Sequence, residues 1–278
     1  MGPEFQLIET FVDAAAASPR APRGPGDDAA VLPRRGGETC VTVDAVVEGV
    51  HFRRASSRLE DVGHKALAVN LSDLAAMGAR PLWALVALGV PRGFRLADAR
   101  RLGAGFGALA RATGTEVVGG NVTRAPGLSL TVTVGGEVPP GRALLRSGAR
   151  PGDRVWVSGV LGDARLGLAL LEKRSGREAG HLAAASRVAV HLEAGALPVS
   201  RAFVTAHPNE RERVRIAASG GEDYELLFTV PAAREARVRR LSRRLGLDLT
   251  PIGDVRRGRG VHLRGTGTAP LHGFDHLV

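Results

Sequence analysis

The sequence predicts a mixed α/β (α+β) protein built from two domains. Segments with strand-like and helix-like patterns are mixed in both halves of the 278 residues, so neither half is all-α or all-β. The run Pro139-Pro140-Gly141 is the best candidate for a hinge, and we expect an N-terminal domain at 1–140 and a C-terminal domain at 141–278. A hydrophobic content of 44% is ordinary for globular chains, and the length allows each domain a core of its own.

Composition patterns predict the elements of the first half. A stretch rich in Val and Thr is typical of strands, stretches rich in Ala and Leu are typical of buried helices, and the Ala, Pro, Gly and Arg of 12–37 predict mostly loop. The expected order is one or two strands at 38–52, one or two helices at 61–79, a strand at 82–90, a helix at 96–113, a strand at 116–118 running into Gly119-Gly120, and a strand at 128–138.

The second half shows the same mixture with weaker signals. The expected elements are a strand at 154–158, a helix opened by Gly162-Asp163 and running through Leu171, a strand at 224–230 and a helix at 232–245. These patterns do not separate a parallel from an antiparallel sheet, so the strand order is left open.

The charge of the chain is basic, with 38 Lys and Arg against 28 Asp and Glu, a formal net charge of +10. One alternative is therefore a nucleic-acid-binding protein, motivated by an arginine cluster in the 232–245 helix: Arg234, Arg237, Arg239, Arg240, Arg243 and Arg244. Val238, Leu241 and Leu245 form an apolar stripe in that helix, so the arginines are better interpreted as its solvated face. No aromatic residues are interleaved with them, and we do not expect nucleic acid as a partner.

Several other classes are excluded by simple features. Cys40 is the single cysteine, so no internal disulfide and no cysteine-built metal site can form; a buried strand thiol is the simplest interpretation. Residues 1–11 carry two glutamates and no long apolar core, unlike a signal peptide. The longest apolar run, 82–90, is too short to span a bilayer. We therefore expect a cytoplasmic protein with no membrane partner.

Acidic residues embedded in apolar surroundings are the most informative feature. Asp28 follows a Gly-Asp turn, Asp44 lies inside a run of Val, Thr and Ala, and Asp73 lies inside a Leu- and Ala-rich segment. A buried unpaired carboxylate is costly, so each needs a partner. Thr42 shares a strand face with Asp44, and Asn70 shares a helix face with Asp73. These oxygens could converge on Mg²⁺; caps, turns and a salt bridge are the alternative for each residue alone.

Four further motifs are weak when each is taken alone. The Gly119-Gly120 pair could let backbone N–H groups approach a phosphate, or could be an ordinary turn. The helix start after 158–163 could attract an anion, or be a cap. The acidic string at 219–225 could be a site or a solvated turn, and the aromatic tail at 271–276 could simply dock the chain end.

Taken together and in order, these segments resemble the thiamine-monophosphate kinases, a branch of the wider PurM-like group of ATP-binding enzymes. The resemblance runs nearly end to end, and the segments that carry it are 26–32, 43–52, 65–79, 141–144 with 146–149, 219–228 and 273–276. The Val47–Phe52 segment and the Gly-Gly-Glu-Asp-Tyr-Glu-Leu string point to the thiamine branch within the group.

The resemblance implies a two-domain PurM-like fold, in which two copies of the N-terminal domain form a barrel-like homodimer core and the C-terminal domain is α/β. It implies ATP-dependent phosphorylation of thiamine monophosphate to thiamine diphosphate. Carried over residue by residue, it implies a metal set of Asp28, Thr42, Asp44, Asp73 and Asn121 for several Mg²⁺ ions, an ATP set of Gly119, Gly120 and Arg146, and a substrate set of His51, Glu222 and Phe274. Asp28, Asp44 and Asp73 would be the catalytic carboxylates.

The sequence departs from the family in two places. The family's glycine motif ends in Asp, and Asn121 stands there, so one negative charge is lost. An Ile-Asp-x-Ser-Asp-Gly-Leu-like segment also has no counterpart, as if a few tens of residues were missing near 175–179; either the protein has lost them or the sequence omits them. Two alternatives follow: a relative that binds nucleotide or thiamine phosphate without turnover, and another PurM-like ATP-dependent synthetase.

Overall fold

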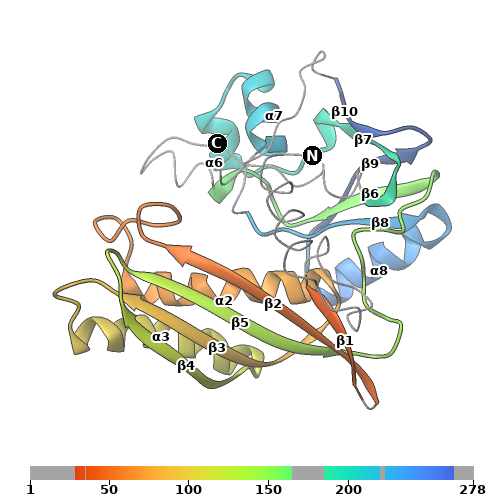
Figure 1. The fold of residues 1–278 in the computed structure, drawn as a ribbon. Coiled ribbons are helices and arrows are strands. Elements are labelled where there is room, and N and C mark those ends of the chain that lie inside the picture. Colours follow the sequence, from red (N-terminus) through yellow and green to blue (C-terminus); the bar gives the residue numbers. More distant parts are fainter. Residues whose placement is uncertain (1–28, 35, 165–184, 220–222, 266–278) are drawn as a thin grey trace. The chain divides into compact units, whose positions relative to one another are not determined.

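The computed structural model describes residues 29–34, 36–164, 185–219 and 223–265 (Figure 1). These residues form two compact units, and the boundary between the units falls between Leu145 and Arg146. The domain boundary expected from the sequence, between residues 140 and 141, lies five residues before this one and remains a prediction. None of the helices in the described part of the chain is long and apolar enough to cross a membrane.

The first unit is a five-stranded sheet covered on one face by two helices. The strand order is β1-β2-β5-β3-β4, with β3 and β4 parallel and the other neighbours antiparallel. The elements are β1 (Ala30–Arg34), β2 (Gly37–Val47), α2 (Leu59–Ala76), β3 (Arg80–Val90), α3 (Leu96–Thr113), β4 (Glu116–Arg124) and β5 (Ser129–Val138). Figure 1 shows α2 and α3 on the same side of the sheet.

The core of this unit lies between α2 and the sheet. Alternate residues of β5, Leu130, Val132 and Val134, are buried, as expected for a strand with one covered face. Leu67 and Leu74 of α2 are fully buried against them in the same core. Cys40 of β2 is also fully buried, which confirms the interpretation as a buried strand thiol, and burial raises its pKa.

The second unit holds another five-stranded sheet, with the order β10-β7-β9-β6-β8. Its elements are β6 (Asp153–Ser158), β7 (Ala189–Glu193), η1 (Ala194–Ala196), α6 (Arg201–Ala206), α7 (Glu210–Ser219), β8 (Leu227–Pro231), η2 (Ala232–Arg234), α8 (Glu235–Leu245), β9 (Leu249–Arg256) and β10 (Gly260–Arg264). β7 and β10 are parallel, and the other pairs are antiparallel.

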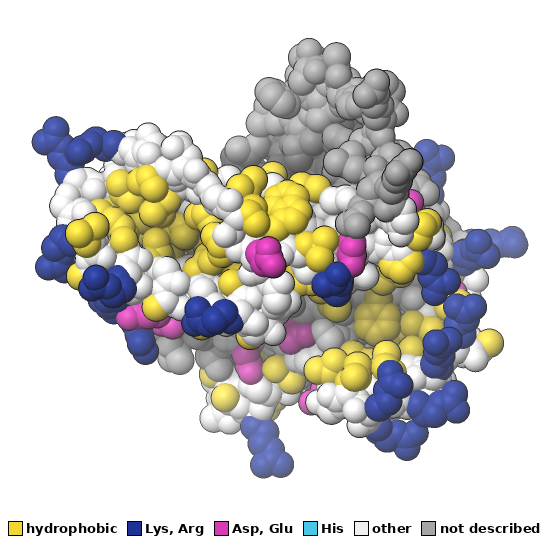
Figure 2. All heavy atoms as spheres, turned by 90° about the horizontal axis from the view of Figure 1, so that it is seen from below, with side chains coloured by type: hydrophobic (Ala, Val, Ile, Leu, Met, Phe, Trp, Pro, Cys, Tyr) yellow, Lys and Arg dark blue, Asp and Glu magenta, His cyan; other side chains and the backbone are white. Residues whose placement is uncertain are grey.

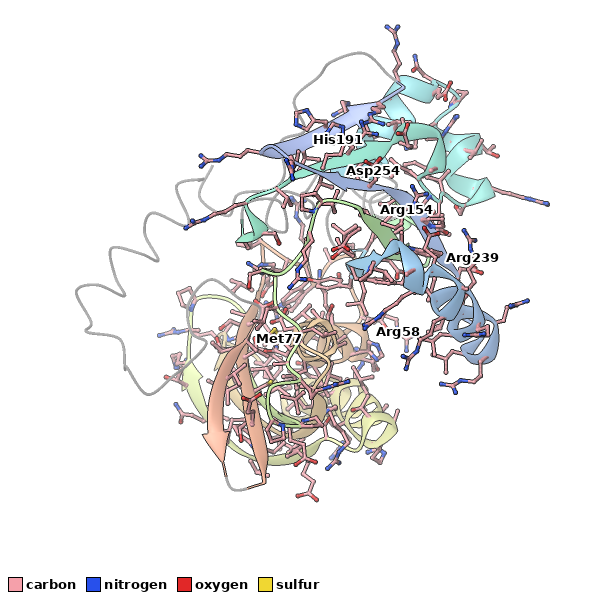
Figure 3. All side chains as sticks on the ribbon, turned by 90° about the vertical axis from the view of Figure 1, so that its right-hand side faces the viewer. Arg58, Met77, Arg154, His191, Arg239 and Asp254 are labelled. Carbon is pink, nitrogen blue, oxygen red and sulfur yellow. The ribbon has the colours of Figure 1, made fainter. Side chains whose placement is uncertain are left out.

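The two faces of this sheet are covered differently. Phe203 of α6 and Ile216 of α7 are buried in one core with Val155 and Val157 of β6. On the alternate positions of β6, Trp156 lies under the Arg239 guanidinium of α8 at 5.2 Å. The two arginines labelled at this end of the sheet in Figure 3, Arg154 and Arg239, both pair with Glu235. α8 thus caps the face opposite to α6 and α7.

The structure corrects the expected elements at three places. The strand expected at 224–230 begins only at Leu227, because Tyr224 has a positive φ that a strand does not allow. Strand β1 lies inside 12–37, which was expected to be mostly loop, because its short segment is recognisable only by its pairing with β2. Strand β4 does not end before the glycine pair: Gly119 and Gly120 lie inside it, paired with Leu85 and Val86. The glycine pair is therefore not a turn that follows a strand. The predicted helix at 96–113 agrees with α3 at both ends.

Candidate functional site in the acidic strand and helix pair

Thr42 and Asp73, 31 residues apart in sequence, are brought together by the packing of α2 on β2. The Thr42 hydroxyl donates a hydrogen bond of 2.7 Å to Oδ2 of Asp73. Thr42 is 6% exposed, so its hydroxyl would be costly to leave without a partner. Two of the predicted metal ligands therefore lie side by side, one from the sheet and one from the helix.

Asp44 lies two residues further along β2, on the same side of the strand as Thr42. Its side chain is exposed, and its Oδ1 accepts a hydrogen bond of 2.7 Å from the backbone N–H of Ala45. This short bond sets the orientation of the carboxylate by local backbone geometry. The third predicted carboxylate, Asp28, lies outside the described residues.

Asn70 carries an unsatisfied atom on the helix face that also bears Asp73. The side chain is fully buried, and its Nδ2 donates to the Ala66 carbonyl at 3.1 Å. Its Oδ1 is buried and has no hydrogen-bond partner in the structure. Buried polar atoms are satisfied in the great majority of cases, so an orphaned amide oxygen one turn from Asp73 indicates a place where water or a ligand completes the shell.

The donor set at this place is made of oxygens alone. Carboxylate, hydroxyl and amide oxygens are what a hard cation such as Mg²⁺ takes as ligands. Within the described residues no group of three or more His, Cys, Asp or Glu is close enough to hold a metal ion by itself. Asp44 and Asp73 are two carboxylates, so a complete ion site needs oxygens from elsewhere: Thr42, Asn121, Asp28 or the ligand.

The glycine pair of β4 has a structural reason that the sequence did not indicate. A Cβ on Gly120 would lie 2.0 Å from the carbonyl oxygen of Val86 on the neighbouring strand, so only glycine allows β3 and β4 to pair here. Beside it, a cavity of about 420 Å³ is lined by Val86, Leu88, Gly120, Asn121 and Val122. Asn121 and three residues with aliphatic side chains thus surround one open space.

His51 follows β2 and is held by two bonds. The backbone N–H of Val47 donates to its Nδ1 at 3.1 Å, so in the neutral ring the proton is on Nε2. The ammonium group of Lys65 donates to the His51 carbonyl at 2.9 Å and ties the loop to α2. The imidazole thus has a defined tautomer, with Nε2–H as its hydrogen-bond donor.

In the second unit, Asp223 of the acidic string is hydrogen-bonded to the backbone at 162–164. The Asp223 carboxylate accepts the N–H of Gly162 at 2.8 Å and the N–H of Ala164 at 3.1 Å. Sequence reasoning treated these motifs separately and did not select Asp223. Burial raises the pKa of Asp223, and Asp163 adds to the shift. The backbone N–H groups of Gly162 and Ala164 thus bind a carboxylate of the chain itself.

The remaining predicted residues of the second unit are only partly described. The carbonyl of Arg146 accepts a hydrogen bond of 3.0 Å from the Ser186 hydroxyl, which also accepts from the N–H of Ala149 at 3.2 Å. Glu222 and Phe274 lie outside the described residues, as does 175–179. The two hydrogen bonds of Ser186 therefore fix the backbone at Arg146.

Arginines gather at two places among the described residues. A cavity of about 760 Å³ is lined by Arg54, Ala55, Ser56, Ser57, Arg58, Leu59, Gly93, Arg95, Asp98 and Arg101. All four of its arginines are ion-paired within the unit, with Glu48, Glu60 or Asp98.

The second group of arginines lies on α8. These arginines are exposed, and Figure 2 shows them crowded at its right edge. Leu241 and Leu245 are 38% and 54% exposed, so the predicted apolar stripe is only partly covered.

Sequence comparison identifies relatives of the whole chain. The N-terminal domain of the AIR synthase related protein family matches residues 26–138. The thiamine-monophosphate kinase of Salmonella typhimurium is 34% identical, over 99% of this chain and 98% of its own length. The chain belongs to the thiamine-monophosphate kinase family. The kinase of Bacillus subtilis is 33% identical, over 91% of both chains.

Solved structures of thiamine-monophosphate kinases have the same fold. The enzyme from Stenotrophomonas maltophilia K279a has a TM-score of 0.78 at 36% identity, covering 96% of this chain and 98% of its own. AaThiL, solved in complex with AMPPCP and TMP, has a TM-score of 0.83 at 32% identity, covering 96% and 95%. Neighbours outside the family, such as HypE of Escherichia coli with 20% identity and a TM-score of 0.68, share the fold alone.

The alignment of this chain with the Salmonella kinase contains gaps. It extends over 326 positions, more than the 278 residues of this chain, so the chain is gapped against a relative that it covers nearly completely.

Proposed function

We propose that this protein is a thiamine-monophosphate kinase, which transfers the γ-phosphoryl group of ATP to thiamine monophosphate and yields thiamine diphosphate and ADP. The observation that carries the proposal is similarity to curated kinases of this name along the whole chain. The complex of a relative with AMPPCP, a methylene analogue of ATP, and TMP supports both substrates.

For the metal we propose Mg²⁺, bound by Asp28, Thr42, Asp44, Asp73 and Asn121. The support is chemical: an all-oxygen donor set, a hydroxyl bonded to a carboxylate, and the orphaned buried oxygen of Asn70 nearby. When bound, Mg²⁺ neutralises phosphate charge, so that two anions can approach each other. Asp44 and Asp73 supply the negative charge that would retain it.

For the nucleotide we propose Gly119, Gly120 and Arg146, and for thiamine monophosphate His51, Glu222 and Phe274. The cavity beside Gly120 and Asn121 supports a ligand at that strand. The defined tautomer of His51 supports hydrogen-bond donation from Nε2 to a phosphate oxygen. Arg146 would contribute a guanidinium, whose planar donors match phosphate geometry.

We propose a direct in-line transfer. An oxygen of the substrate phosphate forms the new bond to the γ-phosphorus while the bond from the γ-phosphorus to the bridging β,γ-oxygen breaks, and ADP leaves with that electron pair. The second pKa of a phosphate monoester is about 6, so the acceptor is mostly ionised at neutral pH and no strong base is needed. Alignment and charge neutralisation are then what the side chains must provide.

We further propose that two copies associate through the uncovered face of the first sheet. α2 and α3 cover one face, and on the other, among the described residues, Val43 of β2 and Leu85 of β3 are 60% and 40% exposed. Strand registers place Ala87 and Thr131 on this same face, and both are exposed.

The proposed association is tested by analytical ultracentrifugation. Val43→Glu places a charge on the uncovered face and should shift the sedimentation coefficient from that of a dimer to that of a monomer. Glu116→Gln, at another exposed position, is the control and should sediment like the wild type.

The proposed activity is tested by turnover of the full chain. ATP, Mg²⁺ and thiamine monophosphate are incubated with the wild type and with Asp73→Asn, and thiamine diphosphate and ADP are quantified by chromatography. We expect equal amounts of both products from the wild type, and a rate lower by at least about 100-fold from the variant. Binding of both ligands without products would instead favour the non-catalytic relative, and phosphorylation of other substrates alone would favour another PurM-like synthetase.

A further inference from the structure

Tyr224 is held in a backbone conformation that side chains disfavour. Its φ is +51°, in the left-handed region that glycine occupies readily. Among the non-glycine residues that the structure describes, only Arg187 shares a positive φ. A residue stays in such a conformation only where its surroundings determine it, and residues of this kind cluster at ligand sites.

The chain is tied down on the N-terminal side of Tyr224. The Asp223 carboxylate accepts two backbone hydrogen bonds, from Gly162 at 2.8 Å and Ala164 at 3.1 Å. Both donors belong to one turn, so the carboxylate is fixed in position and orientation. The backbone that enters Tyr224 is thereby fixed to the loop that follows β6.

The chain is tied down on the C-terminal side as well. The Ser158 hydroxyl donates to the Glu225 carboxylate, and the N–H of Leu226 donates to the same hydroxyl oxygen at 2.8 Å. The N–H of Ser158 in turn donates to the Leu226 carbonyl at 3.1 Å. With anchors on both sides, the protein itself sets the direction in which the Tyr224 side chain leaves the backbone.

The anchored side chain is an accessible aromatic ring in acidic surroundings. Tyr224, the one tyrosine of the chain, is 42% exposed. Asp223 and Glu225 flank it in sequence, and Asp163 acts electrostatically on Asp223. Such surroundings repel a polyphosphate and attract a cation, and the face of an aromatic ring attracts a cation as well.

We infer that the Tyr224 ring stacks on the heteroaromatic part of the substrate, with the positively charged thiazolium ring of thiamine monophosphate as its partner. This inference rests on the proposed function, because that function supplies the substrate. ATP is the poorer partner, since its phosphates would meet the carboxylates of the loop. The left-handed backbone presents the ring, and the Ser158 and Asp223 anchors hold it there before the substrate arrives.

The test compares three substitutions at Tyr224 in the full-length protein. Tyr224→Phe keeps the ring, Tyr224→Ala removes it, and Tyr224→Gly removes it while suiting the positive φ. We expect the alanine and glycine variants to raise KM for thiamine monophosphate about tenfold, with KM for ATP within about twofold of the wild type and Tyr224→Phe close to the wild type. The glycine variant should unfold at the same or a higher temperature than the wild type, so its loss cannot be attributed to misfolding.

Direct binding separates this inference from the proposed function. Calorimetric titration with thiamine, which lacks the phosphate, should show about tenfold weaker binding to the glycine variant than to the wild type. An unchanged KM for thiamine monophosphate in Tyr224→Ala, or equal increases for both substrates, would overturn the inference while turnover of the wild type stands. A wild type that makes no product, yet binds thiamine through Tyr224, would overturn the kinase and leave the ring contact.

Discussion

At the scale of single residues, the hydrogen bond between Thr42 and Asp73 brings together two of the metal ligands expected from the sequence. Asp73 taken alone is better explained by a cap or a turn. The contact between the two residues at 2.7 Å, with the unsatisfied oxygen of Asn70 on the same helix face, concentrates oxygen donors where β2 and α2 meet. Asn121, on the edge strand β4, is the proposed ligand that differs in charge from the family pattern.

Asn121→Asp should restore the missing charge and strengthen metal binding. The affinity of oxygen-ligand sites depends on the number of charged ligands, so we expect the Mg²⁺ concentration for half-maximal activity to fall about 3- to 10-fold. Asn121 is exposed, and the melting temperature should stay nearly constant. The measurement is initial rate against free Mg²⁺. Thr123→Asp, on the same exposed strand, is the control and should leave the Mg²⁺ dependence within about twofold; equal shifts in both variants would remove Asn121 from the ligand set.

At the scale of elements, the close approach of α2 and α3 depends on two glycines. A Cβ on Gly105 would lie 1.7 Å from the carbonyl oxygen of Glu60, and one on Gly63 would lie 2.0 Å from that of Leu102. Backbone cannot yield as a flexible side chain does, so the helices would have to separate. Asp73 is carried by α2, and the helix pair therefore supports the proposed site.

Gly105→Ala should destabilise the protein by about 1–3 kcal/mol, because the added methyl group overpacks a backbone contact. Gly103 lies in the same helix, and nothing lies within 4 Å of a Cβ built on it. Gly103→Ala should therefore stabilise α3 by up to about 1 kcal/mol through helix propensity. Thermal unfolding followed by circular dichroism compares the two; a higher melting temperature for Gly105→Ala would contradict the packing account.

At the scale of the whole molecule, several groups respond to acid in the same direction. Burial lowers the pKa of His191, and the nearby Arg264, His262 and Arg256 lower it further while Asp254 opposes them. The labelled side chains of His191 and Asp254 come from neighbouring strands (Figure 3). Arg264 donates to Nδ1 of His191 at 2.8 Å, a bond that protonation of that nitrogen would break. The hydrogen bonds from Arg101 lower the pKa of the partly exposed Glu60 to about 2.

The free energy of unfolding should therefore fall in two steps as the pH is lowered. The folded pKa of His191 lies below its unfolded value of 6.5, so the neutral ring stabilises the fold above pH 6.5. This contribution is lost as the pH falls from 6.5 through the lower, folded pKa. Glu60 contributes above about pH 4.5, and its contribution is lost as the pH falls towards 2. Urea unfolding of His191→Gln should show a smaller change between pH 7.5 and 5.5, and that of Glu60→Gln a smaller change between pH 4.5 and 3. Unaltered profiles in both variants would refute the assignment.

Local sequence patterns identified much of the fold and only part of the site. α3 was predicted at its observed ends, because helix periodicity is a property of neighbouring residues. Strand β1 was missed, because five residues in a loop-rich segment become a strand only by pairing with β2. Asp223 was missed because its partners, Gly162 and Ala164, lie about 60 residues earlier in the sequence. Such a long-range contact leaves no pattern among neighbouring residues.

The order of the motifs along 278 residues is enough to identify the family, the class of reaction and the candidate residues, because this order is specific even where each motif is weak. Tertiary contacts were needed to show that Thr42 bonds to Asp73, that Gly120 is required by Val86 on the next strand, and that Asp223 and Ser158 hold Tyr224 in a left-handed conformation. Motifs are read from neighbours along the chain, whereas these contacts arise from sheet pairing and helix packing between residues distant in sequence.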